Sequence, residues 1–459
     1  MKMIWAVVVA ALAFSPVATG GARAETLPDA LVSAYRHSNL LEQNRALLRA
    51  ADEDLATAVS ALRPVINFVA NASYRYAELA VPGGKIGSDG TAASIGLSGE
   101  LLLFDGGSSE MGIEAAKEVV MATRQALTGL EQQVLLAALS AYLDVRSAED
   151  VVALSHSNVR LITQELRAAQ DRFEVGEITR TDVAIAEARL ASSRASLAAA
   201  EGDLLVAREA YKAATGAYPG RLAPPPPPPA TAKSLDEAKA VALRNHPQVI
   251  AARHEARVAE LNVARARAAM GPRVGLGGAI TLNDGGLNER SLSLTLTQPV
   301  YQGGRLSALY RRAIAVEAAQ KSAMHQAGVE AAQAAGDAWA RLAVAYAAIE
   351  AGDRQVRAAQ TAYDGVREEA RLGSRTTLDV LNAEQELLDA RTSRIAAENQ
   401  RNVAVYAVLA SMGLLTVKHL GLGIPSYDPD TYFSAVKNAP ATSPQGKKLD
   451  RILKSIGKN

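Results

Sequence analysis

Two stretches of this chain repeat one helix-turn-helix signature, and this internal repeat constrains the fold more than any other feature. RFEVGEITRTDV begins at Arg172, and EARLGSRTTLDV begins 197 residues later, at Glu369. Each contains a glycine, which permits the left-handed backbone that ends a helix, and then Thr and Asp, which cap the next helix. The sequence therefore predicts a duplicated protein with one corner in each half. The matched pairs are Gly176 with Gly373, Thr179 with Thr376, Asp182 with Asp379 and Val183 with Val380.

A second echo lies closer to the N-terminus, where Leu27, Ala30 and Pro64 match Leu235, Ala238 and Pro272 at an offset of 208. Because the offset changes by 11 after the prolines, we expect a loop there to differ in length between the halves. The run Pro224 to Pro229 predicts a stiff, extended connection, with a partner-binding proline motif as the alternative. The expected divisions are a first repeat over 25–223, a proline-rich linker over 224–233, a second repeat over 234–415 and an irregular C-terminal tail over 416–459.

The N-terminus has the pattern of a cleaved secretory signal peptide over residues 1–24. Lys2 precedes an apolar run from Ile4 to Phe14, and Ala22-Arg23-Ala24 follows. A membrane-anchor helix is the alternative, which the short run disfavours. Without Lys2 and Arg23 the chain has 47 basic and 48 acidic residues, so no strong field would attract nucleic acid. The absence of cysteine excludes disulfides, thiolate chemistry and a lipid acceptor at a processed N-terminus.

Long helical patterns fill most of the chain. Leu27 to Leu62 predicts one helix of about ten turns, and Pro64 ends it. After each glycine pair, Gly106-Gly107 and Gly303-Gly304, a helical pattern of about 70 residues predicts a helix about 100 Å long. Helices of roughly 35 residues follow the two corners, so we expect two short helices to stack end to end beside each long one. Apolar and small residues step 3-4-3-4 as in a coiled coil at Val183, Ala186, Leu190, Ser193, Leu197, Ala200 and Leu204.

Four segments between the helices alternate apolar and polar residues, which predicts two β-hairpins with strands of about 10 to 13 residues. The first hairpin should carry a loop with Pro82-Gly83-Gly84 and Ser88-Asp89-Gly90. Its polar side has Arg75 and Glu100, whereas the apolar side ends in Tyr74, Tyr76 and Phe104, as in membrane strands. A soluble sandwich is the alternative, but four strands between such long helices would hardly build its core. No apolar stretch after the signal reaches the roughly 20 residues of a membrane helix.

The chain shows no motif for covalent chemistry. Its six histidines lack metal-ligand spacing, and its glycine clusters do not form a phosphate-binding loop before a helix. We therefore expect no catalytic residue, no metal, no cofactor and no enzyme activity.

The order of helix, hairpin, long helix, glycine turn and helix, given twice, resembles the TolC family of outer-membrane export tunnels. Its most specific marks are VGEITRTDV, LGSRTTLDV and TQPVYQGGRLSALY at Thr297 to Tyr310, together with Pro64 and Pro272. The resemblance implies a mainly α fold with a membrane β-barrel: a long α-helical coiled-coil barrel and four strands per protomer. Four strands cannot close a barrel, whereas a homotrimer gives about 12 and leaves a channel.

The resemblance also implies partners and a location. The channel would lie in the cell outer membrane, in contact with lipid, with its tunnel extending into the periplasm. A periplasmic adaptor and an inner-membrane ABC transporter or RND-type pump would supply its cargo, and nucleic acid would have no role. Tyr427-Asp428-Pro429 looks like the subgroup used in type I protein secretion. Multidrug or small-molecule efflux is the alternative; a periplasmic helical adaptor or scaffold would leave the four strands unexplained.

The family binds its adaptor at the periplasmic tip and closes its tunnel there, and both properties point to the repeated corners. The adaptor contact would fall at Gly176, Glu177, Gly373 and Ser374, unless these turns are only structural corners. We expect Arg375 to reach Asp182 or Thr181, and Asp379 and Asn382 to point into the lumen. The family often has a second acid where this chain has Asn382 and an aromatic where it has Ala370, so the constriction should be less acidic and held by fewer bonds. Alternatively, these charges are solvated helix caps.

Overall fold

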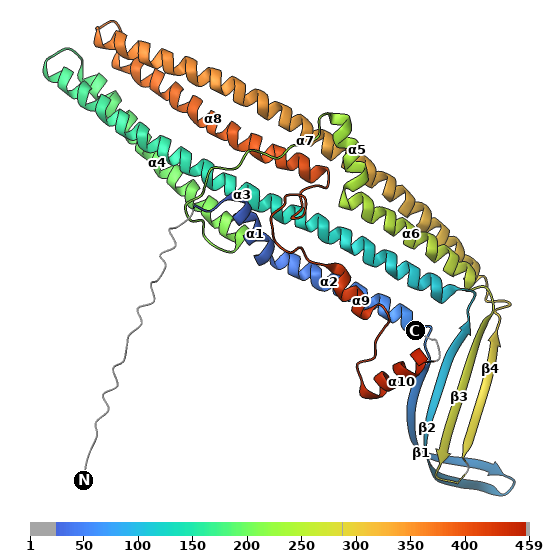
Figure 1. Cartoon of the computed structure of the whole chain (residues 1–459). Helices are drawn as coiled ribbons and strands as arrows, with labels where there is room; N and C mark the ends of the chain where they lie inside the picture. The colour runs from blue at the N-terminus through green and yellow to red at the C-terminus, as the bar shows by residue number, and fades with distance from the viewer. Residues whose placement is uncertain (1–23, 287, 456–459) are drawn as a thin grey trace, which may run out of the picture.

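The computed structural model describes residues 24–286 and 288–455, except for the side chains of residues 453 and 454. Nearly all of the predicted signal peptide lies outside the described residues. The molecule is elongated, with a bundle of long helices, a small sheet at one end and two helix-turn-helix corners at the other (Figure 1). No helix in the described ranges is both long enough and apolar enough to cross a bilayer.

Both halves contain the same elements in the same order, as the repeat predicts. In the first half these are α1 (Leu27–His37), α2 (Asn39–Ser60), β1 (Val65–Val81), β2 (Gly84–Phe104), α3 (Ser108–Glu174) and α4 (Arg180–Thr215). In the second half they are α5 (Leu235–Asn245), α6 (Pro247–Ala268), β3 (Arg273–Asn283), β4 (Glu289–Thr297), α7 (Arg305–Arg371) and α8 (Thr377–Ser411). The proline run between the halves contains neither helix nor strand.

The single helix predicted before each hairpin is wrong, because a short break divides it. Ser38 has extended backbone, and its hydroxyl accepts a hydrogen bond from the Leu41 N–H at 3.3 Å, so a new helix begins there. In the second half His246 is extended because it precedes Pro247, which disfavours helical backbone in the residue before it. Both breaks lie beside the middle of the long helices (Figure 1).

The short helices pack along the long ones, as the lengths predict. Helix α3 contacts α4 over one part and α1 and α2 over another, and α7 contacts α8, α5 and α6 in the same way. Helix α6 also packs against α3, so the wall has the order α2, α3, α6, α7 near the sheet. Each long helix has 67 residues, close to the predicted length. Within the described residues α2 and α7 are therefore the outermost helices of this wall, and α9 also packs on α2.

The sheet is antiparallel, with the strand order β1-β2-β3-β4, and it joins the two halves through β2 and β3. The predicted strand lengths are wrong for the first hairpin, because β1 has 17 residues and β2 has 21, against 11 in β3 and 9 in β4. Ser88-Asp89-Gly90 lies inside β2, where Asp89 pairs with Tyr76, and is not part of a loop. The change of offset between the halves thus comes mainly from longer strands. Cross-strand pairing overrides the weak strand propensity of Gly, Ser and Asp.

The C-terminal segment is not irregular as predicted, since it forms α9 (Pro429–Val436) and α10 (Pro444–Ser455). Leu415 and Val417 are buried in the main core, and the Val417 N–H donates to the Glu131 carboxylate at 2.7 Å. Further along, the Arg124 Nη1 and Asp430 Oδ1 atoms are 2.7 Å apart. Order in this segment comes from contacts with α2, α3 and Arg63. Such contacts with distant residues cannot be recognised from the sequence of the segment alone.

Candidate functional site at the paired helix corners

The two corners have the same local structure, which explains their repeated sequence. Gly176 has φ 79° and Gly373 has φ 81°, the left-handed region that an L side chain rarely adopts. After each glycine the chain turns back to the preceding helix: the Glu177 N–H donates to the Arg172 carbonyl at 2.9 Å, and the Ser374 N–H donates to the Glu369 carbonyl at 3.0 Å. No atom lies within 4 Å of a Cβ added at either glycine, so backbone conformation, rather than crowding, requires them.

Each following helix begins with a reciprocal capping box. The Thr179 N–H donates to Asp182 Oδ2 at 2.9 Å, and the Thr376 N–H donates to Asp379 Oδ2 at 3.0 Å. Hydrogen bonds from Thr179, first from its side chain, lower the pKa of Asp182. Those from Thr376, first from its backbone, lower the pKa of Asp379. Both capping carboxylates therefore stay charged at neutral pH.

The predicted contact from Arg375 to Asp182 or Thr181 is not formed within the protomer. The Arg375 Nε atom instead lies 2.9 Å from Glu369 Oε2, on the preceding helix of the same corner. The turn brings these two side chains together, whereas Asp182 is already engaged in its own cap. Thr181 is exposed, and Glu177 is paired with Arg172 at 3.0 Å. The second corner thus has a local ion pair of its own.

Asn382 connects the two helix pairs. Its Oδ1 atom accepts a hydrogen bond from Arg189 Nη2 on α4, and the two atoms are 3.0 Å apart. Of the five predicted gate residues, Asn382 is the one that this structure joins directly to the other corner's helix. The sequence prediction did not consider Arg189, because its repeat position carries no motif.

A buried carboxyl near the corners was also missed. Glu384 on α8 is 2% exposed, and in the described part of the chain neither of its carboxyl oxygens has a hydrogen-bond partner. Burial, and then the nearby Glu165 carboxylate, raise its pKa to about 7, although Arg189 and Arg367 oppose the shift. The repeat counterpart, Glu187, is exposed. Helical spacing could have predicted the burial of Glu384, because it lies between the buried Val380 and Leu387 on the apolar side of α8.

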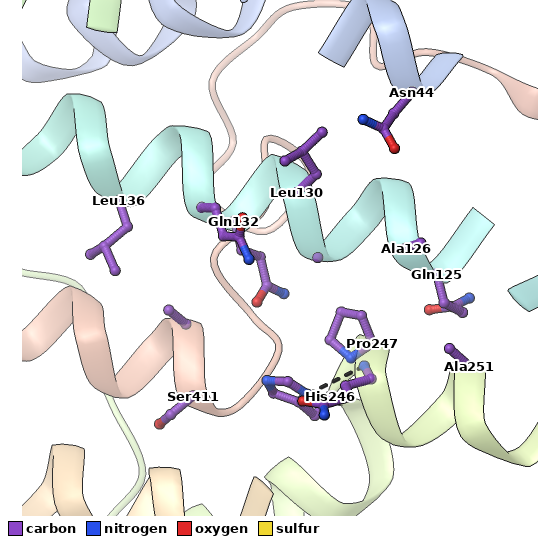
Figure 2. Close-up of a pocket in the computed structure, with 14 residues that line it drawn as sticks. Asn44, Gln125, Ala126, Leu130, Gln132, Leu136, His246, Pro247, Ala251 and Ser411 are labelled. Atoms are coloured by element: carbon purple, nitrogen blue, oxygen red, sulfur yellow. Dashed lines mark hydrogen bonds between the residues drawn. The ribbon is translucent and has the colours of Figure 1, made fainter. Parts of the chain in front are cut away.

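A groove of about 600 Å³ lies farther from the corners, near the middle of the bundle, where α3 faces the α5–α6 break and the end of α8 (Figure 2). His246 and Pro247 lie opposite Leu130 and Gln125, and the His246 Nδ1 atom accepts a hydrogen bond from the Gln248 N–H at 3.3 Å. Burial lowers the pKa of His246, so the ring is neutral near neutral pH. None of the residues that line the groove is acidic. No cluster of acidic or histidine residues able to hold a metal occurs in the described ranges.

Together these features define a class of protein. Long helical columns end in a sheet with exposed apolar side chains, such as Phe68 at 69% and Leu292 at 80% exposure, which is the organisation of a channel that enters a membrane through strands. Comparison with known proteins gives the family. The model of the outer membrane efflux protein family matches residues 30–217 and 240–414, and the chain belongs to that family.

Individual relatives agree with this assignment. The outer membrane efflux protein BepC of Brucella suis is 35% identical over 447 residues, which cover 94% of this chain and 95% of that protein. The alkaline protease secretion protein AprF of Pseudomonas aeruginosa is 27% identical over 274 residues, 56% of this chain and 57% of that protein. The crystal structure of the outer membrane protein VceC from Vibrio cholerae has the same fold, with a TM-score of 0.74 at 20% identity, over 84% of this chain and 96% of that one.

The chain is therefore an outer-membrane efflux channel of the TolC family, and it is not an enzyme. The predicted family, fold class and membrane location are confirmed. The family match stops at residue 414, so the segment that carries α9 and α10 lies beyond it.

Proposed function

We propose that three copies of this chain form one continuous tunnel, which receives cargo from an inner-membrane transporter through a periplasmic adaptor. The open sheet carries this proposal. Strands β1 and β4 are its edges, and all nine residues of β4 are exposed. In lipid, the unpaired backbone groups of such edges would be strongly unfavourable, so each edge needs a partner strand.

The two edge strands, β1 and β4, have directions that allow them to pair between copies. All neighbouring strands are antiparallel, so β4 runs opposite to β1, and β4 of one copy can pair with β1 of the next. Two copies would give about 8 strands, whose interior side chains nearly fill, whereas three would give about 12 and leave an aqueous channel. A trimer is thus the smallest ring that suits a conduit.

The flanks of the helical wall support the same assembly. Helices α2 and α7 are the outermost helices of the wall near the sheet, and they do not pack on each other within the described residues of one protomer. We infer that α7 of one copy packs beside α2 of the next and continues the wall around the ring.

The corners would form the periplasmic tip. Gly176, Glu177, Gly373 and Ser374 are exposed at the end of the bundle, which makes them available to an adaptor. Thr181, Asp182, Arg375, Asp379 and Asn382 would form the constriction that closes the tunnel at rest. Arg375 would have to exchange its local partner Glu369 for a group on another corner, and an exposed ion pair is weak enough for that exchange.

For the cargo, we propose type I protein secretion with an ABC transporter. The observations that support it are the Tyr427-Asp428-Pro429 segment and the similarity to a relative named for protease secretion. Multidrug or small-molecule efflux with an RND-type pump is the second candidate. It is favoured by the greater identity to a relative named as an efflux protein.

Two measurements test these statements. The detergent-purified protein should have the mass of a trimer, and a monomer in mild detergent with no conductance in planar bilayers would overturn the tunnel. A deletion strain should lose specific secreted proteins, with restoration by the wild-type gene. Unchanged secretion with increased drug susceptibility would favour efflux, and no change in either would overturn an export role in the tested strain.

A further inference from the structure

We propose that α10 is an interfacial helix that binds anionic phospholipid headgroups on the periplasmic leaflet of the outer membrane. This inference relies on the outer-membrane location of the sheet, but not on the number of copies or the cargo. Its basis is the position of α10 beside the first strand, combined with the distribution of charge along the helix.

The position of α10 is fixed by Arg63, which lies between the end of α2 and the start of β1. Its Nη1 atom donates to the Ala439 carbonyl at 2.7 Å and lies 3.6 Å from Asp450 Oδ1 on α10, and its Nη2 atom donates to the Asn438 carbonyl. Asp450 also accepts a hydrogen bond from the Ala441 N–H at 2.8 Å. These contacts hold α10 at the level where the helical bundle passes into the membrane sheet (Figure 1).

The residues of α10 separate by character around the helix. At 100° per residue, Lys447 and Arg451 fall on one side, Lys448 lies at its margin, and Leu449 and Ile452 fall on the opposite side. Asp450 lies between the two sides, where it meets Arg63. The three basic residues are exposed, and so is Ile452, at 57%. Protein contacts thus use the Asp450 side of the helix and leave both the basic and much of the apolar side open.

The charge of this segment contrasts with the rest of the chain. Residues 444–459 contain five basic residues and one acidic residue, whereas the whole sequence has a net charge of only +1. A cationic amphipathic helix at the edge of a bilayer matches a surface of phosphates above acyl chains: basic side chains reach the headgroups while the apolar side enters the boundary. A protein partner would explain the apolar side but not its placement beside the membrane strands.

The test uses the full-length protein in proteoliposomes, labelled at a single introduced cysteine. Because the chain has no native cysteine, Ile452→Cys carries the only environment-sensitive fluorophore, and lipids with a quencher near the headgroup report its depth. Ser455→Cys, near the basic side of the same helix, is the matched control, and Ser374→Cys reports the distant tip. We expect quenching at position 452 to exceed that at 455 by about twofold and to rise with phosphatidylglycerol content, since such helices enter by about 5–10 Å.

A charge variant separates headgroup binding from simple proximity. Lys447→Gln with Lys448→Gln and Arg451→Gln should abolish the dependence on phosphatidylglycerol, whereas Lys447→Arg with Lys448→Arg should keep it. Equal quenching with and without anionic lipid, or no quenching at 452 in any vesicle, would overturn the proposal. Cross-linking between copies at 452 without quenching would overturn it in favour of a second protomer as the occupant. Conductance of the same vesicles measures tunnel assembly separately, so failure of either proposal can be recognised.

Discussion

Arg189 on α4 donates a hydrogen bond to Asn382 on α8, with 3.0 Å between Nη2 and Oδ1. This bond links a helix of the first repeat to a helix of the second, close to the corners. Few contacts join α4 and α8 elsewhere, since α4 packs mainly on α3 and α8 on α7 and α3. Beside it, Leu381 of α8 packs in a buried cluster with Ile162 of α3 and Leu190 of α4, so the bond is the polar part of a mainly apolar junction.

Removing this link should loosen the tip. Asn382→Leu leaves the Arg189 guanidinium without its acceptor, and we expect a higher single-channel conductance in planar bilayers because the helix pairs can separate. Gln385→Ala is the matched control, since it removes a hydrogen bond to Asp389 that stays within α8. If both variants conduct like the wild type, the link does not restrain the tip.

Removing charges from the proposed gate should raise single-channel conductance more than Asn382→Leu does. Arg375→Ala combined with Asp182→Asn removes two gate charges and retains a capping oxygen at position 182, so helix α4 still has a favourable N-cap interaction. We expect raised conductance and greater sensitivity of cells to large antibiotics. Glu369→Gln breaks the observed Arg375 pair without removing either gate charge, and should have a smaller effect. Unchanged conductance in the double variant, with trimers present, would falsify the gate at this site.

Glu384 should make stability depend on pH. Because its pKa is raised from 4.5 to about 7, the folded protein binds this proton more tightly than the unfolded chain does. Its contribution therefore favours folding at low pH and is lost as the pH rises from about 4.5 to about 7. The charged groups around it are Glu165 on α3, Arg189 on α4 and Arg367 on α7, and Tyr363 on α7 lies in the same cluster.

The variant Glu384→Gln should remove this titration. We expect it to raise the apparent melting temperature at about pH 8 but to have little effect at about pH 5. The corresponding gain in the free energy of unfolding at pH 8 is on the order of 2 kcal/mol after allowance for solvent screening. Thermal unfolding followed by far-UV circular dichroism in detergent measures the melting temperature at each pH. Glu187→Gln, at the exposed repeat counterpart, should change neither. Equal effects of the two glutamine variants would contradict the assignment.

The corner glycines should be needed for export but not for assembly. Gly176→Val with Gly373→Val forces branched side chains into left-handed backbone, at a cost of roughly 1–2 kcal/mol for each corner, and alters the exposed tip. We expect trimers to reach the membrane while secretion is lost. Gly202→Ala in α4, where a Cβ meets no atom within 4 Å, is the control and should export normally. Normal export from the double variant would remove the tip from adaptor binding.

The sequence predicted the parts of this fold that depend on long, uninterrupted periodicity. The α3 and α7 helices and both capped corners follow from local rules, because Gly176 and Gly373 end helices and Thr179 and Thr376 begin them. The break at Ser38 was missed, since a single serine within a helical pattern is compatible with either structure. Strand length in the first hairpin was also missed, because pairing partners outweigh propensity.

The site was less predictable because its contacts join distant parts of the chain. Arg375 was assigned to the other corner, but Glu369 lies nearer across the turn. Asn382 was identified without its partner, Arg189, which is 193 positions away in the sequence. The raised pKa of Glu384 requires helices from both repeats to exclude water, and no pattern in α8 alone contains that information.

The unequal hairpins have a consequence for the outer face of the protein. Strand β3 pairs with β2 as far as Ser94, and Asp284 then hydrogen-bonds Ala93, so among the described residues the ends of β1 and β2 beyond Ala72 and Ala93 pair only with each other. At about 3.3 Å per residue, this two-stranded ribbon extends roughly 25–30 Å beyond the shared sheet. In the proposed trimer, the tip of this ribbon would contribute nothing to strand pairing around the pore. An epitope inserted between Pro82 and Gly83 should therefore be displayed to antibodies on intact cells without closing the exit.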